Sequence, residues 1–194
     1  MEIIKCFEYR LYKFKCDESI YLETKLNDLI HTLLNSEYAN EQRVIEGVGN
    51  VVTTNGMDSN LTDYDESTKL VNWIKNQILA IQKFNSFKVE NIKSTRSWVN
   101  KMDKGSEGLV HTHKTEANVV AIFYLSNSEN GSNLVVTKNT KENISYLECD
   151  ETDVSIIETN TGDLILHESN VPHAVSLHQS KKPRICLVFE FEVG

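Results

Sequence analysis

The segment from residue 108 to residue 125 reads GLVHTHKTEANVVAIFYL, and it is the most informative part of the sequence for the fold. It joins a His-x-His pair, His111 and His113, to a run of apolar and β-branched residues. In a strand, residues i and i+2 point to the same face, so the spacing predicts two imidazoles close enough to share a metal ion. Taken alone, such a pair is more typical of two polar residues on an ordinary strand than of a metal site.

The sequence on both sides of this stretch has the texture of a β protein. Short apolar segments are separated by turn signals, and the strands expected from them are 88–93, 95–102, 109–113, 117–125, 133–138, 144–148, 154–158, 163–168, 173–178 and 184–192. The Asn-Gly within residues 129–132 predicts a hairpin between 117–125 and 133–138, and residues 160–163 predict a second turn. Many short strands at this spacing indicate a double-sheet jelly roll or a barrel.

The first half of the chain is mixed. Residues 3–15 alternate loosely and predict one edge strand. Helical spacing of apolar residues predicts two amphipathic helices, from Ser19 to about Asn35 and from about Glu66 onward, with residues 46–65 as a loop between them. The two stripes are Leu22, Leu26, Leu29, Ile30 and Leu33, then Leu70, Val71, Ile74, Ile78 and Ile81. We expect both helices to pack on the sheet made by the rest of the chain.

Length and composition indicate one globular domain of 194 residues with 40% apolar and 25% charged content. We expect residues 1–94 to supply the N-terminal strand and two supporting helices, and residues 95–194 to form the β core. The net charge of −8 disfavours nucleic-acid binding, which depends on clustered Lys and Arg.

The sequence also indicates where the protein works. No stretch has the apolar length of a membrane span, and the start, MEIIKCFEYRLYKFK, carries charges every few residues, unlike an export signal. We therefore expect a cytoplasmic protein with no membrane partner and with four reduced cysteines, in preference to a Cys6–Cys16 bridge. A homodimer is the default expectation for its assembly.

Three features downstream strengthen the metal interpretation of the histidine pair. A third histidine, His173, lies in TGDLILHESNVPHAV, residues 161–175. Arg184 follows it by eleven residues, at the head of an otherwise apolar strand in KPRICLVFEF. Tyr124 ends the strand that follows the pair.

In this order and spacing the sequence resembles the Fe(II)- and 2-oxoglutarate-dependent oxygenases. The resemblance covers roughly residues 95–192. FYLS followed by ENGSNL is similar to the Tyr-Leu-Asn…Gly-Gly pattern of the prolyl-hydroxylase-like members, and TGDLILHESNVPHAV to their Gly-x-Leu-x-Phe…His-x-Val. SWVN followed by HTH and FYL is similar to a subfamily of oxygenases with no assigned substrate.

The resemblance implies a double-stranded β-helix core, with Fe(II), 2-oxoglutarate and O₂ as cofactor and cosubstrates. It implies that His111, His113 and His173 are the catalytic iron ligands. It also implies that Arg184 holds the distal carboxylate of 2-oxoglutarate, which suits the planar, bidentate guanidinium, with help from Tyr124. The implied reaction is hydroxylation of an unidentified substrate with release of succinate and CO₂.

One departure from the family pattern concerns the third ligand. The usual triad has a carboxylate where this chain has His113. Either His113 is the ligand and the site has three histidines, or a carboxylate such as Glu116 completes the triad after a turn. We favour His113. Imidazole suits Zn, Ni and Cu as well as Fe, so the ligands alone do not name the metal.

Two rival functions follow from the same residues. The first is a three-histidine, cupin-type metalloenzyme that does not use 2-oxoglutarate, and the second is a metal-free jelly-roll binding module. The response of cosubstrate affinity to Arg184→Ala separates the oxygenase from the first rival. His167 and His178 lack the spacing of the ligands, so we expect structural or surface roles for them.

Overall fold

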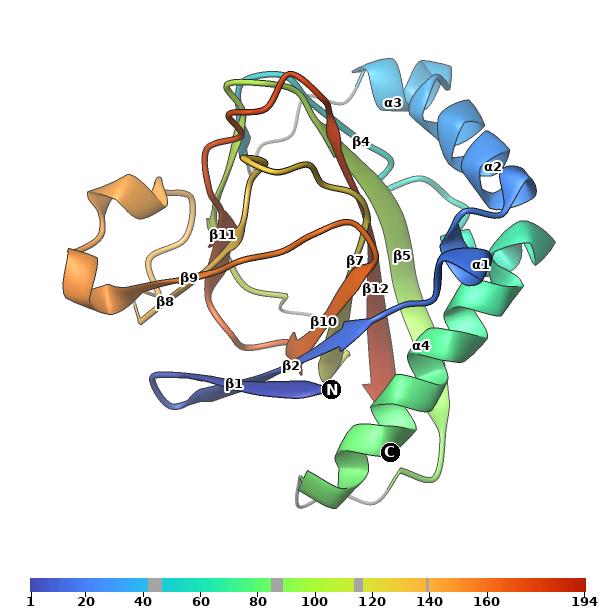
Figure 1. Cartoon of the computed structure of the whole chain (residues 1–194), viewed down its shortest axis with the longest axis horizontal. Helices are drawn as coiled ribbons and strands as arrows, with labels where there is room; N and C mark the ends of the chain where they lie inside the picture. The colour runs from blue at the N-terminus through green and yellow to red at the C-terminus, as the bar shows by residue number, and fades with distance from the viewer. Residues whose placement is uncertain (42–46, 85–88, 114–116, 139) are drawn as a thin grey trace.

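The computed structural model describes residues 1–41, 47–84, 89–113, 117–138 and 140–194, and two antiparallel sheets dominate it (Figure 1). The larger sheet has the order β1 (Glu2–Cys6), β2 (Tyr9–Lys15), β10 (Asp163–Glu168), β7 (Val119–Ser126), β12 (Arg184–Val193), β5 (Ile92–Met102) and β4 (Val51–Thr53). The smaller has the order β3 (Gly47–Val48), β6 (Glu107–His111), β11 (His173–Val175), β8 (Leu134–Thr137) and β9 (Val154–Ile157).

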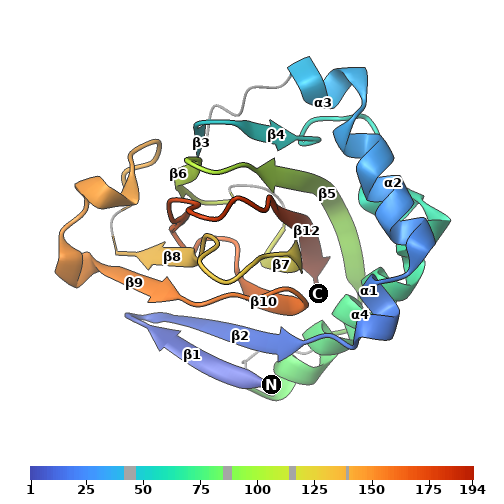
Figure 2. The same ribbon diagram turned by 45° about the horizontal axis from the view of Figure 1, so that its top comes forward.

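The sheets face each other and wrap around a common interior, as the ring of strands in Figure 2 shows. The helices α1 (Glu18–Tyr21), α2 (Thr24–Leu34), α3 (Glu37–Glu41) and α4 (Thr68–Ile81) lie outside the ring. Short 3₁₀ turns complete the described elements: η1 (Leu61–Asp63), η2 (Asp65–Ser67), η3 (Gln82–Phe84), η4 (Tyr146–Glu148) and η5 (Glu151–Asp153). The mainly β, double-stranded β-helix prediction is confirmed.

Strand β7 shows why its sequence is apolar without interruption. It lies in the middle of the larger sheet, between β10 and β12, and both of its faces are buried. Phe123 points outward and packs against α1 and α4, with its ring 5.7 Å from Tyr21 and 6.3 Å from Trp73. Ile122 and Tyr124 point inward to the core between the sheets. Each such large apolar side chain stabilises the fold by about 1.5–3 kcal/mol.

The N-terminal predictions are partly confirmed. The expected single strand at residues 3–15 is a hairpin, β1 and β2, which turns at Phe7 with a φ of 58°. The first predicted helix is two helices, α1 and α2, and Asp17 caps α1 by accepting a hydrogen bond from the Ser19 backbone N–H. The second predicted helix is confirmed as α4, whose buried residues are those of the predicted stripe.

The expected hairpin at the Asn-Gly is wrong. Strand β7 belongs to the larger sheet and β8 to the smaller one, so residues 127–133 cross between the sheets. The physical reason is that β10 and β12 occupy both edges of β7. The crossing is held by the buried Asn127 amide, which donates to the Ser132 and Thr159 carbonyls.

Three other secondary-structure predictions differ from the structure. Residues 46–65 include β3 and β4, the two segments expected at 88–93 and 95–102 form the single strand β5 from Ile92, and residues 144–148 contain the 3₁₀ turn η4 in place of a strand. Ser145 caps that turn by accepting from the Leu147 N–H, which explains the failed strand. Cys6, Cys16 and Cys186 are free thiols, so the Cys6–Cys16 bridge does not form. Among the described residues, no helix is long and apolar enough to cross a bilayer.

Candidate metal centre

His111 and His173 come together because their strands pair. His111 ends β6, His173 begins β11, and the two residues are direct antiparallel partners in the smaller sheet. Their rings lie 4.3 Å apart, centroid to centroid. Directly opposite residues in an antiparallel pair bring their side chains together on one face. The pairing of β6 with β11 therefore places the two imidazoles side by side in the interior.

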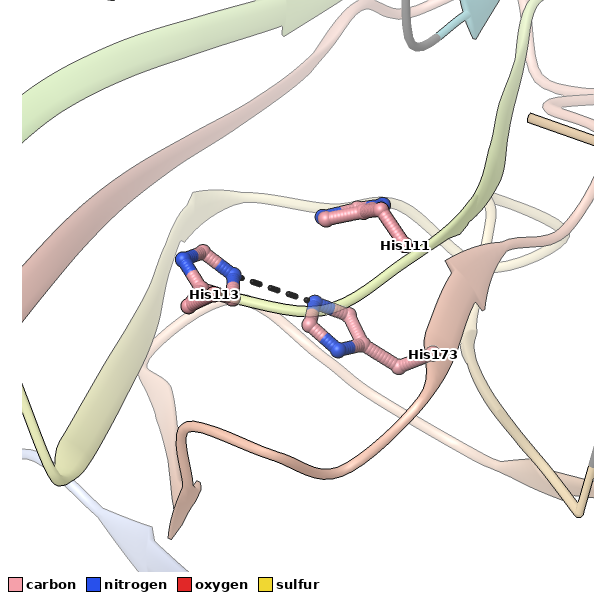
Figure 3. Close-up of side chains that lie close together, drawn as sticks. All are labelled: His111, His113 and His173. Carbon is pink, nitrogen blue, oxygen red and sulfur yellow. Dashed lines mark hydrogen bonds between the residues drawn. The ribbon is translucent and has the colours of Figure 1, made fainter. Parts of the chain in front are cut away.

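His113 reaches the same point from the segment after β6. Its backbone N–H donates to the Ser169 carbonyl at 2.9 Å, which ties this segment to the turn after β10. The Nε2 atoms of His113 and His173 are 3.3 Å apart. One nitrogen from each of the three histidines lies within 4.8 Å of the other two, and Figure 3 shows the three rings close together.

The hydrogen bonds of the three rings orient their nitrogens alike. Nδ1 of His111 is 2.8 Å from the Leu109 carbonyl, and Nδ1 of His173 is 2.9 Å from the Val171 carbonyl. Nδ1 of His113 is 2.7 Å from Oε1 of Glu190. Carbonyl and carboxylate oxygens accept, so each Nδ1 donates and each Nε2 carries the lone pair that a metal needs.

Burial keeps His173 in the neutral, metal-binding form. Removal from water, with the neighbouring histidines His111, His167 and His113 adding to the effect, holds the pKa of His173 well below its usual range. Because Nδ1 of both rings donates to an oxygen, the two Nε2 atoms 3.3 Å apart face each other as acceptors. A cation coordinated by both nitrogens would turn this contact into an attraction.

The structure thus brings together the three histidines proposed as ligands. Glu116, the alternative third ligand, lies outside the described residues. Among the described residues, the cluster that could hold a metal consists of His111, His113 and His173 alone. The ligand role of His113 stays a prediction, now supported by the position of its ring.

Arg184 and Tyr124 form a second polar pair in the same interior. Arg184 is 2% exposed, and its guanidinium carbon lies 4.9 Å from the centre of the Tyr124 ring. Its Nη1 is near two sulfur atoms, Sγ of Cys186 at 3.2 Å and Sδ of Met102 at 3.5 Å. Sulfur is a weak acceptor, so these contacts do little to offset the burial of a full charge.

This pair offers hydrogen-bond donors without acceptors. Nε of Arg184 and the hydroxyl of Tyr124 are buried, and neither has a hydrogen-bond partner among the described residues. Burial raises the pKa of Tyr124 despite the opposing charge of Arg184, so the phenol keeps its proton and can donate. A buried cation beside an unused hydroxyl donor fits a carboxylate ligand, which would accept from both.

Sequence reasoning missed Glu190, which contacts the centre. It is 1% exposed and lies on β12, the strand that also carries Arg184. A signal for it existed: Arg184, Cys186, Val188 and Glu190 alternate along the strand and point to the interior, so a carboxylate shares the face of the proposed cosubstrate anchor.

His167 was expected to be structural or on the surface, and the structure places it beside the cluster. Its ring lies 4.8 Å from that of His173. Nδ1 is 2.7 Å from the Glu168 carbonyl, while Nε2 is buried without a partner among the described residues. Burial lowers the pKa of His167 to about 3. His178 is structural as expected, because both of its ring nitrogens are bonded, to the Ser132 N–H and the Lys182 carbonyl.

Trp98 is buried and contacts the centre. Its ring stacks on His113 at 5.8 Å with an interplanar angle of 26°. Arg96 lies on the same ring, with its guanidinium carbon 5.3 Å from the ring centre. Trp98 therefore restricts the orientation of His113 from the side of β5.

Residues 96–190, a range that includes the three histidines and Arg184, match the family described as "Putative 2OG-Fe(II) oxygenase". No curated protein matches the chain. Several solved structures share the fold. A prolyl 4-hydroxylase from Pseudomonas putida is 12% identical with a TM-score of 0.59, over 95% of this chain and 92% of that one.

Two further structures show the range of proteins with this fold. The viral collagen prolyl hydroxylase of Paramecium bursaria Chlorella virus-1, solved as a 2-oxoglutarate complex, is 13% identical with a TM-score of 0.58, over 93% of this chain and 94% of that one. SnoN, a non-haem α-ketoglutarate-dependent epimerase from nogalamycin biosynthesis, is 12% identical with a TM-score of 0.64, over 93% and 76%. At such identities the likeness establishes the fold alone, whereas the match over residues 96–190 is to the family of putative 2OG-Fe(II) oxygenases.

Proposed function

We propose that this protein is an Fe(II)- and 2-oxoglutarate-dependent dioxygenase that hydroxylates a substrate still to be identified. The observation that carries the proposal is the buried Arg184, which no carboxylate of the described chain neutralises. A buried, unpaired cation is destabilising by several kcal/mol, so a fold retains one where a ligand supplies the anion. The family match and the three-histidine cluster support the same conclusion.

Each residue has a defined task in this proposal. His111, His113 and His173 would hold the metal through their Nε2 atoms. Arg184 binds the distal carboxylate of 2-oxoglutarate through its guanidinium, and Tyr124 donates its hydroxyl proton to the same group. With O₂, the bound metal and cosubstrate supply the two-electron oxidation whose products are succinate, CO₂ and the hydroxylated substrate.

The apolar interior supports this chemistry by excluding water. Ile122, Val136, Ile165 and Val188 are buried in the core between the sheets. A dry, low-dielectric interior strengthens the attraction between Arg184 and a carboxylate and prevents the unproductive release of reactive species.

The test is anaerobic binding of Fe(II) and 2-oxoglutarate to the purified protein. The metal chelate gives a visible charge-transfer band, and we expect that band with the wild type. Arg184→Met removes the charge while keeping most of the volume, and we expect it to weaken 2-oxoglutarate binding by about 2–5 kcal/mol, which is roughly 30-fold or more. Arg10→Met, at an exposed arginine of β2, is the matched control and should leave binding unchanged.

One observation favours a second candidate. The described metal cluster contains no carboxylate, which is typical of cupin-type enzymes that do not use 2-oxoglutarate. A protein that binds metal through the three histidines but gives no band with 2-oxoglutarate would support this candidate and overturn the first. A protein that binds no divalent metal would overturn both and leave a jelly-roll binding module.

A further inference from the structure

Glu190 contacts His113, one of the proposed metal ligands, and the proposed function gives it no task. Its Oε1 atom lies 2.7 Å from Nδ1 of His113, and the side chains are 1% and 6% exposed. The contact joins residues 77 positions apart, so it depends on the assembled barrel. A short, buried bond between a carboxylate and an imidazole is a charge-assisted hydrogen bond, one of the stronger kinds.

Local backbone geometry places this carboxylate. Glu190 keeps the regular alternation of β12, since the strand pairs with β7 without a register shift at this point. Pairing with β5 does shift register between Glu190 and Phe191, and the extra residue is Thr95 of β5. The Thr95 hydroxyl donates to the Glu190 carbonyl at 3.2 Å. Strand alternation therefore directs the Glu190 side chain to the interior, on the face that carries Arg184.

Two side chains face the Glu190 carboxylate, one at hydrogen-bond distance and one at the longer distance of an ion pair. Oε1 accepts from His113, and Oε2 lies 4.0 Å from Nη1 of Arg96. Arg96 is itself held by the Asn55 side chain, to which it donates at 2.5 Å. The carboxylate thus makes a hydrogen-bonded contact with His113 and an ion-pair contact with Arg96.

The three histidines differ in the partner of Nδ1. His111 and His173 donate to neutral backbone carbonyls, whereas His113 donates to a carboxylate. His113 also occupies the position at which the family pattern has an acidic ligand. The negative charge that the sequence lacks at that position is therefore present one hydrogen bond further from the metal.

We infer that Glu190 is a positioning residue that acts through His113, fixing its Nδ1–H tautomer and supplying the negative charge that a three-histidine site lacks. A histidine that donates to a carboxylate is a more basic and better oriented ligand than one that donates to a neutral acceptor. The inference rests on the metal-binding half of the proposed function and is independent of 2-oxoglutarate.

The charge is tested by Glu190→Gln, which keeps the shape and an acceptor oxygen but removes the charge. Co(II), which is stable to oxidation and visible through its d–d bands, is titrated into the protein without 2-oxoglutarate. We expect the dissociation constant to rise 10- to 100-fold, the range seen when the partner of a ligating histidine is lost. Glu192→Gln, two residues further along the same strand and exposed, is the control and should bind Co(II) like the wild type.

The tautomer is tested by ¹⁵N NMR of histidine-labelled, metal-free protein. We expect Nδ1 of His113 to be protonated in the wild type and Glu190→Ala to abolish that preference, while His111 and His173 keep theirs. Equal changes at all three rings would mean that Glu190 merely supports the fold, and would overturn the inference. So would Co(II) affinity within threefold of the wild type in Glu190→Gln, a measurement that decides the matter alone where Glu190→Ala does not fold.

These outcomes separate the two proposals. Co(II) affinity that depends on Glu190, together with no charge-transfer band from Fe(II) and 2-oxoglutarate, would uphold this inference and overturn the proposed function. A band with normal Co(II) affinity in Glu190→Gln would do the reverse.

Discussion

At the scale of single residues, His167 is the side chain whose environment is hardest to justify by packing. Its Nε2 is a buried acceptor without a partner among the described residues, and such an atom is destabilising by about 1–3 kcal/mol. The flanking β10 residues Leu166 and Ile165 are ordinary core residues. A polar ring retained there, 4.8 Å from His173, indicates a role in the site.

We therefore predict that His167→Phe raises the free energy of unfolding of the metal-free protein, by about 1–3 kcal/mol, because the substitution removes the unsatisfied nitrogen. Chemical denaturation measures the change. His178→Phe is the matched control: both nitrogens of His178 are bonded, so its replacement should destabilise the protein. A fall in stability of similar size for both variants would contradict the prediction.

The same histidine predicts how stability depends on pH. In the folded state the pKa of His167 is lowered by burial to about 3, whereas the unfolded value is about 6.5. The unfolded chain thus binds a proton between these values and the folded chain does not. The contribution of His167 to stability is complete above about pH 6.5 and is lost as the pH falls, by up to about 1.4 kcal/mol per pH unit.

Denaturation of the metal-free protein at pH 7 and pH 5 measures this loss. His167→Phe should show a shallower decline than the wild type, because one neutral buried base has been removed. Equal slopes for the two proteins would show that His167 does not contribute to the acid sensitivity.

The residue scale also shows what the sequence could and could not reveal. His111, His113 and His173 were found because strand alternation and their order along the chain are visible in sequence. Glu190 shares the inward face of Arg184 and could have been found by the same alternation. The proximity of His167 to the cluster depends on how β10 of the larger sheet lies relative to β11 of the smaller one. Local sequence patterns do not show this arrangement.

At the scale of elements, α4 is the helix that most depends on the larger sheet. Ile74 is fully buried against the outer face of the sheet, whereas Leu79, on the same helix, is 40% exposed. We predict that Ile74→Ala lowers the free energy of unfolding by about 2–5 kcal/mol, since it removes apolar contacts and leaves a cavity. Leu79→Ala should change it by less than about 0.5 kcal/mol, as is usual for surface substitutions.

Thermal and chemical denaturation of the two variants provide the measurement. Similar losses for Ile74→Ala and Leu79→Ala would mean that α4 is held by helix propensity and not by the sheet. The contrast therefore tests the packing that the structure assigns to this layer.

Secondary-structure prediction succeeded where local periodicity determines the element, and it failed where strand pairing determines it. The stripe of α4 was visible because one face of the helix is apolar. The Asn-Gly hairpin was wrong because pairing partners depend on the whole sheet: both edges of β7 are taken, by β10 and β12. The long helix expected to begin at Ser19 divides because Tyr21 turns inward onto Phe123, ending α1 early.

At the scale of the whole molecule, the candidate metal ligands join segments that are distant in sequence. We predict that a divalent ion that binds the native state stabilises the fold by mass action, by about 2.7 kcal/mol at 100 times its dissociation constant. Thermal unfolding with and without Mn(II) measures the shift. His173→Gln should lose the shift, and His31→Gln, at an exposed histidine of α2, should retain it. A shift that survives in His173→Gln would place the metal elsewhere.

The contact between His113 and His173 has a consequence for the order of events in folding. The two residues are 60 positions apart, and their convergence requires β6 and β11 to be already paired. Contacts of such long range form late, after the loop-closure entropy has been overcome. An ion that binds only the assembled cluster does not bind the folding transition state. It therefore lowers the unfolding rate and leaves the folding rate unchanged. The metal would then slow the unfolding of a protein that folds without it.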